Sequence, residues 1–156
     1  MRRETTFSPC RTYRYALWRE FGGLLDDSRY VMFIGLNPST ADETNDDPTI
    51  RRCIGYAKAW GYNALCVTNL FAFRATDPTV MLNADDPVGP DNDSHLVKLA
   101  GGADMIVAAW GNDGSHRERD RIVRELLPGL HCLALTRAGQ PAHPLYLKGS
   151  LRPKPL

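Results

Sequence analysis

The stretch Phe33-Ile34-Gly35-Leu36-Asn37-Pro38-Ser39-Thr40-Ala41-Asp42 decides the fold class of this chain. It ends an apolar run that starts at Tyr30, and this run predicts a buried strand over residues 30–36. Pro38 cannot donate a hydrogen bond to a sheet and favours extended geometry at Asn37, so the strand ends there. A polar loop follows, and Asp47-Pro48 predicts a helix start with Asp47 as the N-cap. Open α/β sheets bind ligands where a strand gives way to a loop and then a helix.

The rest of the chain repeats this alternation. Apolar runs predict further central strands over residues 64–71, 105–110 and 131–136. Helical periodicity predicts a helix from Asp47 to Gly61, a short helix ending at Ala100, and a helix that Ser115 caps. Residues 13–19 predict an antiparallel or edge strand, 1–11 an irregular segment, 22–28 a turn and 77–94 a long loop. This order predicts one α/β domain over residues 1–156, with helices on both sides of a mainly parallel sheet.

The composition limits the function classes. An apolar fraction of 43% and a charged fraction of 24% are typical of a soluble globular protein. No apolar run has the length of a membrane span and no signal peptide is evident, so we expect a cytoplasmic protein without a membrane partner. The net charge of +1 argues against a generic polyanion binder, although residues 137–156 carry four Lys and Arg and no acid. The cysteines form no CxxC pair, and Cys53, Cys66 and Cys132 fall in apolar stretches, so we expect core residues rather than a disulfide framework or zinc site.

Polar residues follow each predicted central strand. The strand ends carry Asn37-Pro38-Ser39, then Asn69 with Arg74 and Thr76, then Trp110-Gly111, and finally Thr136 leading to His143. The carboxyl ends of parallel strands meet at one edge of a sheet, so these residues predict a site there. The alternative is that irregular surface connections prefer the same residue types.

Asn37 and His143 are the sharpest candidates. The amide of Asn37 both donates and accepts, so it can hold a water or the edge of a base, unless it only closes an Asx-turn. His143 lies between Pro and Gly residues, which would fix a neutral imidazole for donation to a developing oxyanion. Ser39 and Thr40 can offer hydroxyl and backbone donors to an anion. Arg51, in the first turn of the predicted helix, indicates either a bound anion or a local salt bridge.

The acidic loop offers a metal hypothesis. Asp42, Glu43, Asp46 and Asp47 are oxygen ligands of the kind that hard cations prefer. Their spacing matches no calcium loop, however, and Asp47 is expected to cap a helix. No P-loop, Rossmann or Gly-X-Ser-X-Gly fingerprint is present. We therefore predict neither a cofactor nor a resident metal.

Several motifs together resemble a bacterial and phage domain family of unknown function. They are Tyr13-Arg14-Tyr15, Gly35-Leu36-Asn37-Pro38-Ser39-Thr40-Ala41-Asp42, Asp46-Asp47-Pro48-Thr49-Ile50, Thr68-Asn69-Leu70-Phe71-Ala72, Arg74-Ala75-Thr76-Asp77-Pro78, Ala109-Trp110-Gly111 and Gly139-Gln140-Pro141-Ala142-His143-Pro144-Leu145-Tyr146.

Two of these motifs are also similar to those of the uracil-DNA glycosylase superfamily. Gly35-Leu36-Asn37-Pro38 resembles the motif whose Asn positions the attacking water, and His143-Pro144-Leu145 the motif whose His stabilises the departing base. Ser39 departs from the Gly or Tyr usual in the first motif. This resemblance implies a three-layer α/β/α sandwich with a short parallel sheet, here with an added N-terminal edge strand or hairpin.

Three functions follow as hypotheses. The first is a glycosylase-like hydrolase that cleaves the N-glycosidic bond of a base in DNA or a nucleotide, with Asn37 and His143 as catalytic residues. The second is a module that binds a nucleotide or modified base without cleavage, and the third a metal-dependent phosphoesterase. The expected partner is nucleic acid or a nucleotide. The expected substrate-binding residues are Gly35, Pro38, Ser39, Thr40, Asp42, Asp46, Asp47, Arg51, Asn69, Arg74, Thr76, Trp110, Gly111, Pro144 and Lys148.

Overall fold

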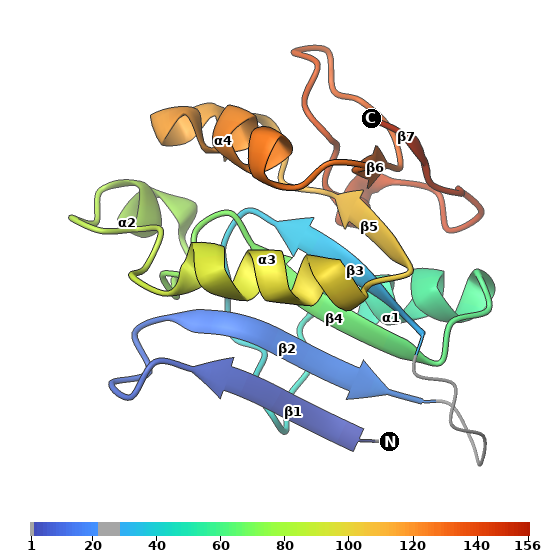
Figure 1. The fold of residues 1–156 in the computed structure, drawn as a ribbon, viewed down its shortest axis with the longest axis horizontal. Coiled ribbons are helices and arrows are strands. Elements are labelled where there is room, and N and C mark those ends of the chain that lie inside the picture. Colours follow the sequence, from blue (N-terminus) through green and yellow to red (C-terminus); the bar gives the residue numbers. More distant parts are fainter. Residues whose placement is uncertain (1, 22–28) are drawn as a thin grey trace.

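The computed structural model describes residues 2–21 and 29–156, so the predicted turn at 22–28 lies outside the described residues (Figure 1). One seven-stranded sheet runs through the molecule in the order β1-β2-β4-β3-β5-β6-β7. The strands are β1 (Arg2–Phe7), β2 (Arg14–Glu20), β3 (Tyr30–Gly35), β4 (Ala64–Asn69), β5 (Met105–Ala108), β6 (His131–Cys132) and β7 (Lys154–Pro155). The predicted α/β class is confirmed.

The sheet is mixed, which corrects the prediction of a mainly parallel one. Its centre is parallel, because β4, β3, β5 and β6 pair in that sense. Both margins are antiparallel, where β1 pairs with β2, β2 with β4 and β7 with β6. Crossover helices make the central strands parallel, whereas the margins are built from a hairpin and the returning C-terminal segment.

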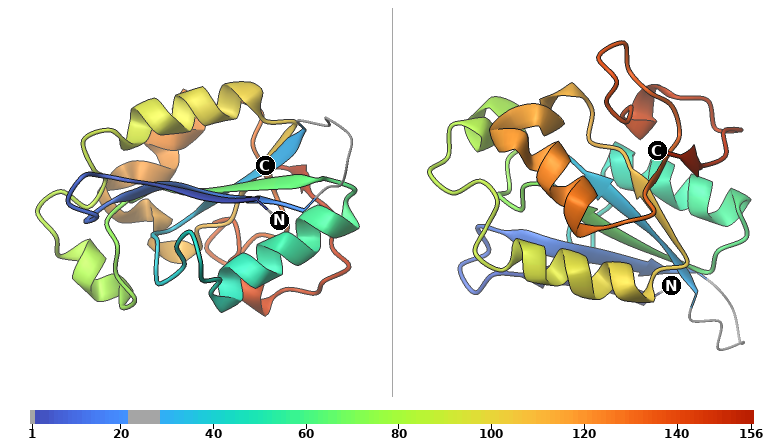
Figure 2. Two further views of the ribbon diagram at one scale, coloured as in Figure 1. Left: turned by 90° about the horizontal axis from the view of Figure 1, so that it is seen from below. Right: turned by 45° about the horizontal axis from the view of Figure 1, so that its top comes forward.

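Helices lie on both faces of the sheet (Figure 2). Helix α1 (Pro48–Ala59) covers one face, and α3 (Asn92–Gly102) and α4 (Arg119–Leu126) lie on the other. Asp47 caps α1 as predicted, since its Oδ1 accepts from the Ile50 N–H at 2.9 Å. Ile50, Cys53 and Ala57 of α1 pack with Phe33 and Val67 of the sheet in one core cluster. The predicted buried state of Cys53, Cys66 and Cys132 is confirmed.

Four sequence predictions were wrong at the level of elements. Residues 2–7 form β1, because pairing with β2 satisfies the backbone of a polar segment that has no core pattern. The predicted loop at 77–94 contains the short helix α2 (Pro78–Leu82), capped by Asp77. Ser115 caps no α-helix, because residues 112–118 form the 3₁₀ segment η1 (Asn112–Glu118) and α4 starts at Arg119. The strand predicted at 131–136 stops at Cys132.

The N-terminal hairpin, formed by β1 and β2, holds the acidic loop at 42–46. The Arg19 side chain on β2 is fully buried and pairs with Asp46 at 2.8 Å. The same guanidinium donates to the backbone carbonyls of Asp42 and Asn45. The hairpin therefore fixes the loop that leads from β3 to α1. No helix in the described part of the chain has the length and apolar character needed to cross a membrane.

Candidate functional site

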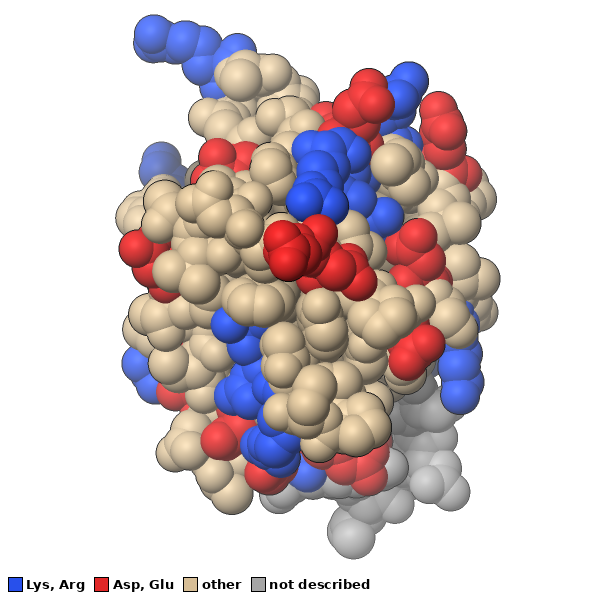
Figure 3. Space-filling model, turned by 90° about the vertical axis from the view of Figure 1, so that its left-hand side faces the viewer, with Lys and Arg blue, Asp and Glu red and all other residues tan. Residues whose placement is uncertain are grey.

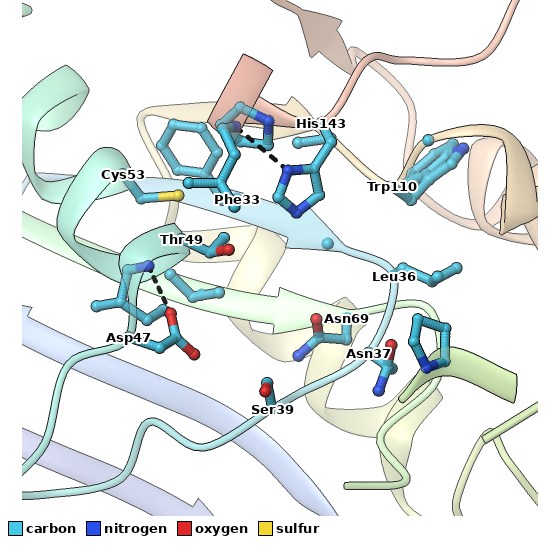
Figure 4. Close-up of a pocket in the computed structure, with 18 of the residues that line it drawn as sticks. Phe33, Leu36, Asn37, Ser39, Asp47, Thr49, Cys53, Asn69, Trp110 and His143 are labelled. Carbon is cyan, nitrogen blue, oxygen red and sulfur yellow. Dashed lines mark hydrogen bonds between the residues drawn. The ribbon is translucent and has the colours of Figure 1, made fainter. Parts of the chain in front are cut away.

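A pocket of about 500 Å³ lies at the carboxyl ends of β3, β4 and β5 (Figure 4). Its wall also includes the first turn of α1 and the segment around η2 (Pro144–Tyr146). The pocket brings together ten of the residues predicted from the sequence. They are Gly35, Asn37, Ser39, Asp47, Asn69, Thr76, Trp110, Gly111, His143 and Pro144.

The amide of Asn37 is fixed by the backbone around it. Its Nδ2 donates to the carbonyl oxygens of Ala75 at 2.8 Å and Pro38 at 3.1 Å. Both amide protons are thereby engaged, and Oδ1 remains as an acceptor on the pocket side (Figure 4). Asn37 can thus accept a hydrogen bond from a water or ligand but has no amide proton left to offer.

His143 presents one ring nitrogen to the pocket. Its Nδ1 accepts from the Leu145 N–H at 3.2 Å, so the proton of the neutral imidazole is on Nε2. The ring extends into the pocket (Figure 4). Burial lowers the pKa of His143 below 6.5, and the nearby Asp47 carboxylate only partly opposes that effect. The ring is therefore a neutral N–H donor at neutral pH.

Helix α1 holds the segment that carries His143. Arg52 donates to the carbonyls of Pro144 and Leu147. One turn later Tyr56 donates to the Lys148 carbonyl at 2.7 Å, and after another turn Trp60 donates to Leu151 at 3.0 Å. Positions 52, 56 and 60 share one face of the helix, so three side chains fasten residues 144–151 along it.

Asp47 has two roles. One carboxylate oxygen caps α1, and the other extends toward the pocket (Figure 4). Thr49 lines the same wall from the first turn of the helix. A carboxylate at this place can accept a proton or a ligand hydroxyl, and Asp47 is among the substrate-binding residues expected from the sequence.

Trp110 forms part of the pocket wall. Its side chain is buried, and its Nε1 donates to Gln140 Oε1 at 2.9 Å. A Cβ on Gly114 would lie 2.1 Å from the indole, so only glycine fits against this ring. These contacts fix Trp110 in the wall and leave little ring surface on which a base could stack.

The sequence analysis missed one buried cation in the pocket. Arg14 of β2 lines it and is only 2% exposed. Phe33, Ile50, Cys53 and Val67 supply the apolar part of the pocket wall. Arg14 belongs to the Tyr13-Arg14-Tyr15 motif of the family resemblance, but the alternation around it is typical of a strand with one wet face and does not indicate burial.

Seven predicted binding residues lie outside the pocket lining: Pro38, Thr40, Asp42, Asp46, Arg51, Arg74 and Lys148. Asp42 accepts from the backbone N–H groups of Thr44 and Asn45, which lowers its pKa to about 2. Asp46 is held between Arg19 and Arg3. Two of the four carboxylates in the metal hypothesis therefore stabilise their own loop.

The three predicted basic ligands are also used elsewhere or lie apart. Arg51 donates to the Asp46 carbonyl at 3.0 Å. Arg74 donates to the Arg11 carbonyl and lies over the Phe7 ring, 4.5 Å from its centroid. Lys148 is exposed. Among the described residues, no group of three or more His, Cys, Asp or Glu side chains is placed to hold a metal ion.

The surface toward which β3 and β5 point carries mixed charge (Figure 3). Lys and Arg side chains lie in separate groups with Asp and Glu side chains between and beside them. A long nucleic-acid duplex is bound mainly through a continuous basic face. The surface fits a small or locally bound ligand better than an extended duplex.

A comparison with models of protein families identifies the family of this chain. The family described as "Protein of unknown function (DUF1643)" matches residues 14–145. The chain belongs to the DUF1643 family. The DUF1643 match includes every pocket-lining residue except Tyr146, whereas β1 and β7 lie outside it. No curated protein and no solved structure matches the chain.

Proposed function

We propose that this protein hydrolyses the N-glycosidic bond of a base in DNA or in a nucleotide. The observation that supports this proposal is the shared pocket of Asn37 and His143, which are over a hundred residues apart in sequence. Asn37 offers an acceptor that cannot turn, and His143 offers a neutral N–H donor. The arrangement of helices on both faces of a parallel sheet centre is compatible with the three-layer glycosylase fold.

The reaction needs an acceptor for water and a donor for the base. Asn37 Oδ1 orients a water, whose oxygen forms a bond to the anomeric carbon of the sugar. The carbon–nitrogen bond breaks, and its electron pair leaves with the base. His143 Nε2–H donates to the oxygen on which the charge of the base develops. The free oxygen of Asp47 takes the proton that the water loses.

Release of free base tests the proposal. The substrates are single- and double-stranded oligonucleotides that contain uracil or a modified base, together with free nucleotides. His143→Asn keeps an acceptor for the Leu145 N–H but removes the pocket donor, so we expect a loss of about a hundredfold in rate. His143→Gln places an amide N–H near the lost Nε2 and should recover part of that rate.

Matched controls separate chemistry from folding. His131→Asn changes a histidine outside the pocket, and Asn83→Ala removes an amide that, like Asn37, donates to a backbone carbonyl. Both should keep the wild-type rate, whereas Asn37→Ala should lose it. No base release from any substrate, or equal release by Asn37→Ala and wild type, would refute the proposal.

A binding module is the second candidate, and one observation favours it. Both amide protons of Asn37 hold the loop at Pro38 and Ala75, which is the arrangement of a residue that shapes a site. Recovery of intact nucleotide after tight binding would support this candidate. We do not propose the phosphoesterase, because Asp42 and Asp46 lie outside the pocket lining.

A further inference from the structure

Arg14 is a buried cation without an ion-pair partner among the described residues. Its Nη1 donates to the Ala41 carbonyl at 2.9 Å, but its Nε has no hydrogen-bond partner. Burial lowers the pKa of Arg14 to about 10, so the guanidinium is still charged at neutral pH. A buried charge is costly unless it is paired and hydrogen-bonded, so an anionic ligand would relieve this cost.

A second donor without a partner lines the same pocket. Asn69, at the end of β4, is 3% exposed and its Nδ2 has no hydrogen-bond partner. Its amide lies close to the β3 backbone, because a Cβ on Gly35 would be 2.9 Å from Asn69 Oδ1. Arg14 and Asn69 come from neighbouring strands, and the Arg14 N–H bonds the Ala72 carbonyl just beyond β4. Two residues that line one cavity therefore each carry a buried donor without a hydrogen-bond partner among the described residues.

The nearest compensation for Arg14 comes from Asp47, and it is incomplete. Asp47 is the carboxylate whose charge favours the protonated form of Arg14. One of its oxygens is engaged with the Ile50 N–H, and no ion pair joins it to Arg14. The two donors consequently have no acceptor in the part of the chain that the structure describes.

We propose that Arg14 and Asn69 form an anion subsite that binds an oxyanion covalently attached to the ligand. The Nε–H and Nη2–H groups share one edge of the guanidinium, and this edge matches two oxygens of a phosphate or carboxylate. The proposal deepens the proposed function and rests on it only in taking this pocket as the ligand site. It assigns the group that the pocket recognises on the substrate: either the phosphate of a nucleotide or an acidic group on the base.

Equilibrium binding to the whole chain tests the subsite without turnover. The probes are uridine, which is neutral, uridine 5′-monophosphate, which carries a phosphate, and orotidine, which carries a carboxylate on its base. We expect at least one acidic probe to bind about tenfold tighter than uridine. The probe that gains affinity identifies the source of the oxyanion. Equal affinity for all three, or binding of none, overturns the subsite.

Two variants locate the effect. Arg14→Lys keeps the charge but loses the two-pronged edge, so we expect the preference for the acidic probe to fall several-fold while uridine binding stays within about twofold. Arg119→Lys is the matched control, since Arg119 is equally buried but bonds Leu70 and Asp93 outside the pocket. It should bind as wild type.

The experiment separates failure of the subsite from misfolding of a variant and from failure of the proposed function. If Arg14→Lys does not fold, Asn69→Ala decides, because it removes the second donor and should also reduce the preference. An undiminished preference in either folded variant overturns the subsite. Absence of base release alongside a preference that Arg14→Lys removes refutes hydrolysis but supports the subsite. Base release without a preference for an acidic probe supports hydrolysis but refutes the subsite.

Discussion

The two ring nitrogens of His143 have different roles, one in holding the local turn and one in facing the pocket. Its Nδ1 caps the short η2 turn through the Leu145 N–H, and that bond leaves the proton on the nitrogen that faces the pocket. Protonation of Nδ1 would abolish the cap, because a protonated nitrogen cannot accept. The same titration would therefore disturb both the turn and the donor.

We expect a pH dependence from this residue. The pKa of His143 in the folded protein lies below 6.5, so the ring is neutral above that pH. As the pH falls, the His143 ring is protonated at a higher pH in the unfolded chain than in the folded protein. The free energy of unfolding therefore decreases as the pH falls below about 6.5. The rate of base release should be level above this pH and fall below it. Nuclear magnetic resonance titration of the His143 ring checks the assignment, and a midpoint above 6.5 would contradict it.

Asp42 provides a second test at the level of one residue. Its carboxylate accepts from two backbone N–H groups, so Asp42→Ala should destabilise the fold by about 1 kcal/mol at pH 7. The folded pKa of about 2 lies below the ordinary pKa of 3.8 for an aspartate, so this stabilisation is present above pH 4 and is lost as the pH falls toward 2. Urea unfolding of both proteins at pH 7, 4 and 3 measures the difference.

A neighbouring acid is the control for Asp42. Glu43 forms an exposed pair with Arg11 at 3.5 Å, and such pairs contribute little. Glu43→Ala should change the free energy of unfolding by less than about 0.5 kcal/mol. An equal loss in the two variants would mean that charge, and not the Asx-turn of Asp42, stabilises the loop.

At the scale of elements, α1 determines where the His143 segment lies. Arg52, Tyr56 and Trp60 contact carbonyls spread over residues 144–151, which otherwise have little regular structure. The segment is therefore fastened by side chains rather than by a ladder of backbone hydrogen bonds. Its order depends on a helix that is nearly a hundred residues earlier in the chain.

Arg52→Ala should release this segment. We expect faster amide hydrogen exchange at Leu145 and Leu147, together with a fall of about tenfold in kcat and a smaller change in KM, because Arg52 positions His143 without touching the ligand. Arg51→Ala is the matched control on the same helix, since Arg51 donates only to the Asp46 carbonyl in the acidic loop. Unchanged exchange at residues 145–147 in Arg52→Ala would show that η2 orders itself.

At the scale of the whole molecule, the N-terminal hairpin stabilises the acidic loop through the side chain of Arg19. Arg19 is fully buried and serves Asp46 and two loop carbonyls, so Arg19→Met leaves a partly buried carboxylate and two acceptors without this donor. Asp46 keeps its contact with Arg3, and the Asn45 carbonyl still accepts from the Asp42 N–H. Loss of the buried pair with Asp46 should nevertheless lower the free energy of unfolding by about 3 kcal/mol. Urea denaturation measures it.

Arg3 contacts the same carboxylate from a more exposed position, with a third of its side chain accessible. Arg3→Met should therefore cost less than about 1 kcal/mol. We attribute the stabilising effect to the burial of the Arg19 contact and not to the charge of Asp46 alone. Similar losses of unfolding free energy in Arg19→Met and Arg3→Met would contradict this explanation.

Local signals in the sequence predicted the central elements and ten of the residues that line the pocket. The apolar run at 30–36, the Asp47-Pro48 start and the periodicity of Ile50, Cys53 and Ala57 describe β3 and α1 correctly, because adjacent residues decide these features. The same logic placed Asn37, Asn69, Gly111 and His143 at one edge, and the structure places them in one pocket. Their chemical roles remain proposals.

Contacts between distant segments decided what the sequence missed. Residues 2–7 have no core pattern and become a strand only because β2 offers them a partner, and Lys154–Pro155 join the sheet only beside β6. Arg14 has the sequence context of a surface residue and is buried in the pocket instead.

The sequence by itself therefore determined the parallel α/β centre and the polar residues at its edge, since hydrophobic periodicity and strand-ending residues act locally. Only the tertiary structure decided which charges are used within the protein and which face the pocket. That outcome depends on burial and on partners far away in the chain, as Arg19 with Asp46 and the unpaired Arg14 demonstrate.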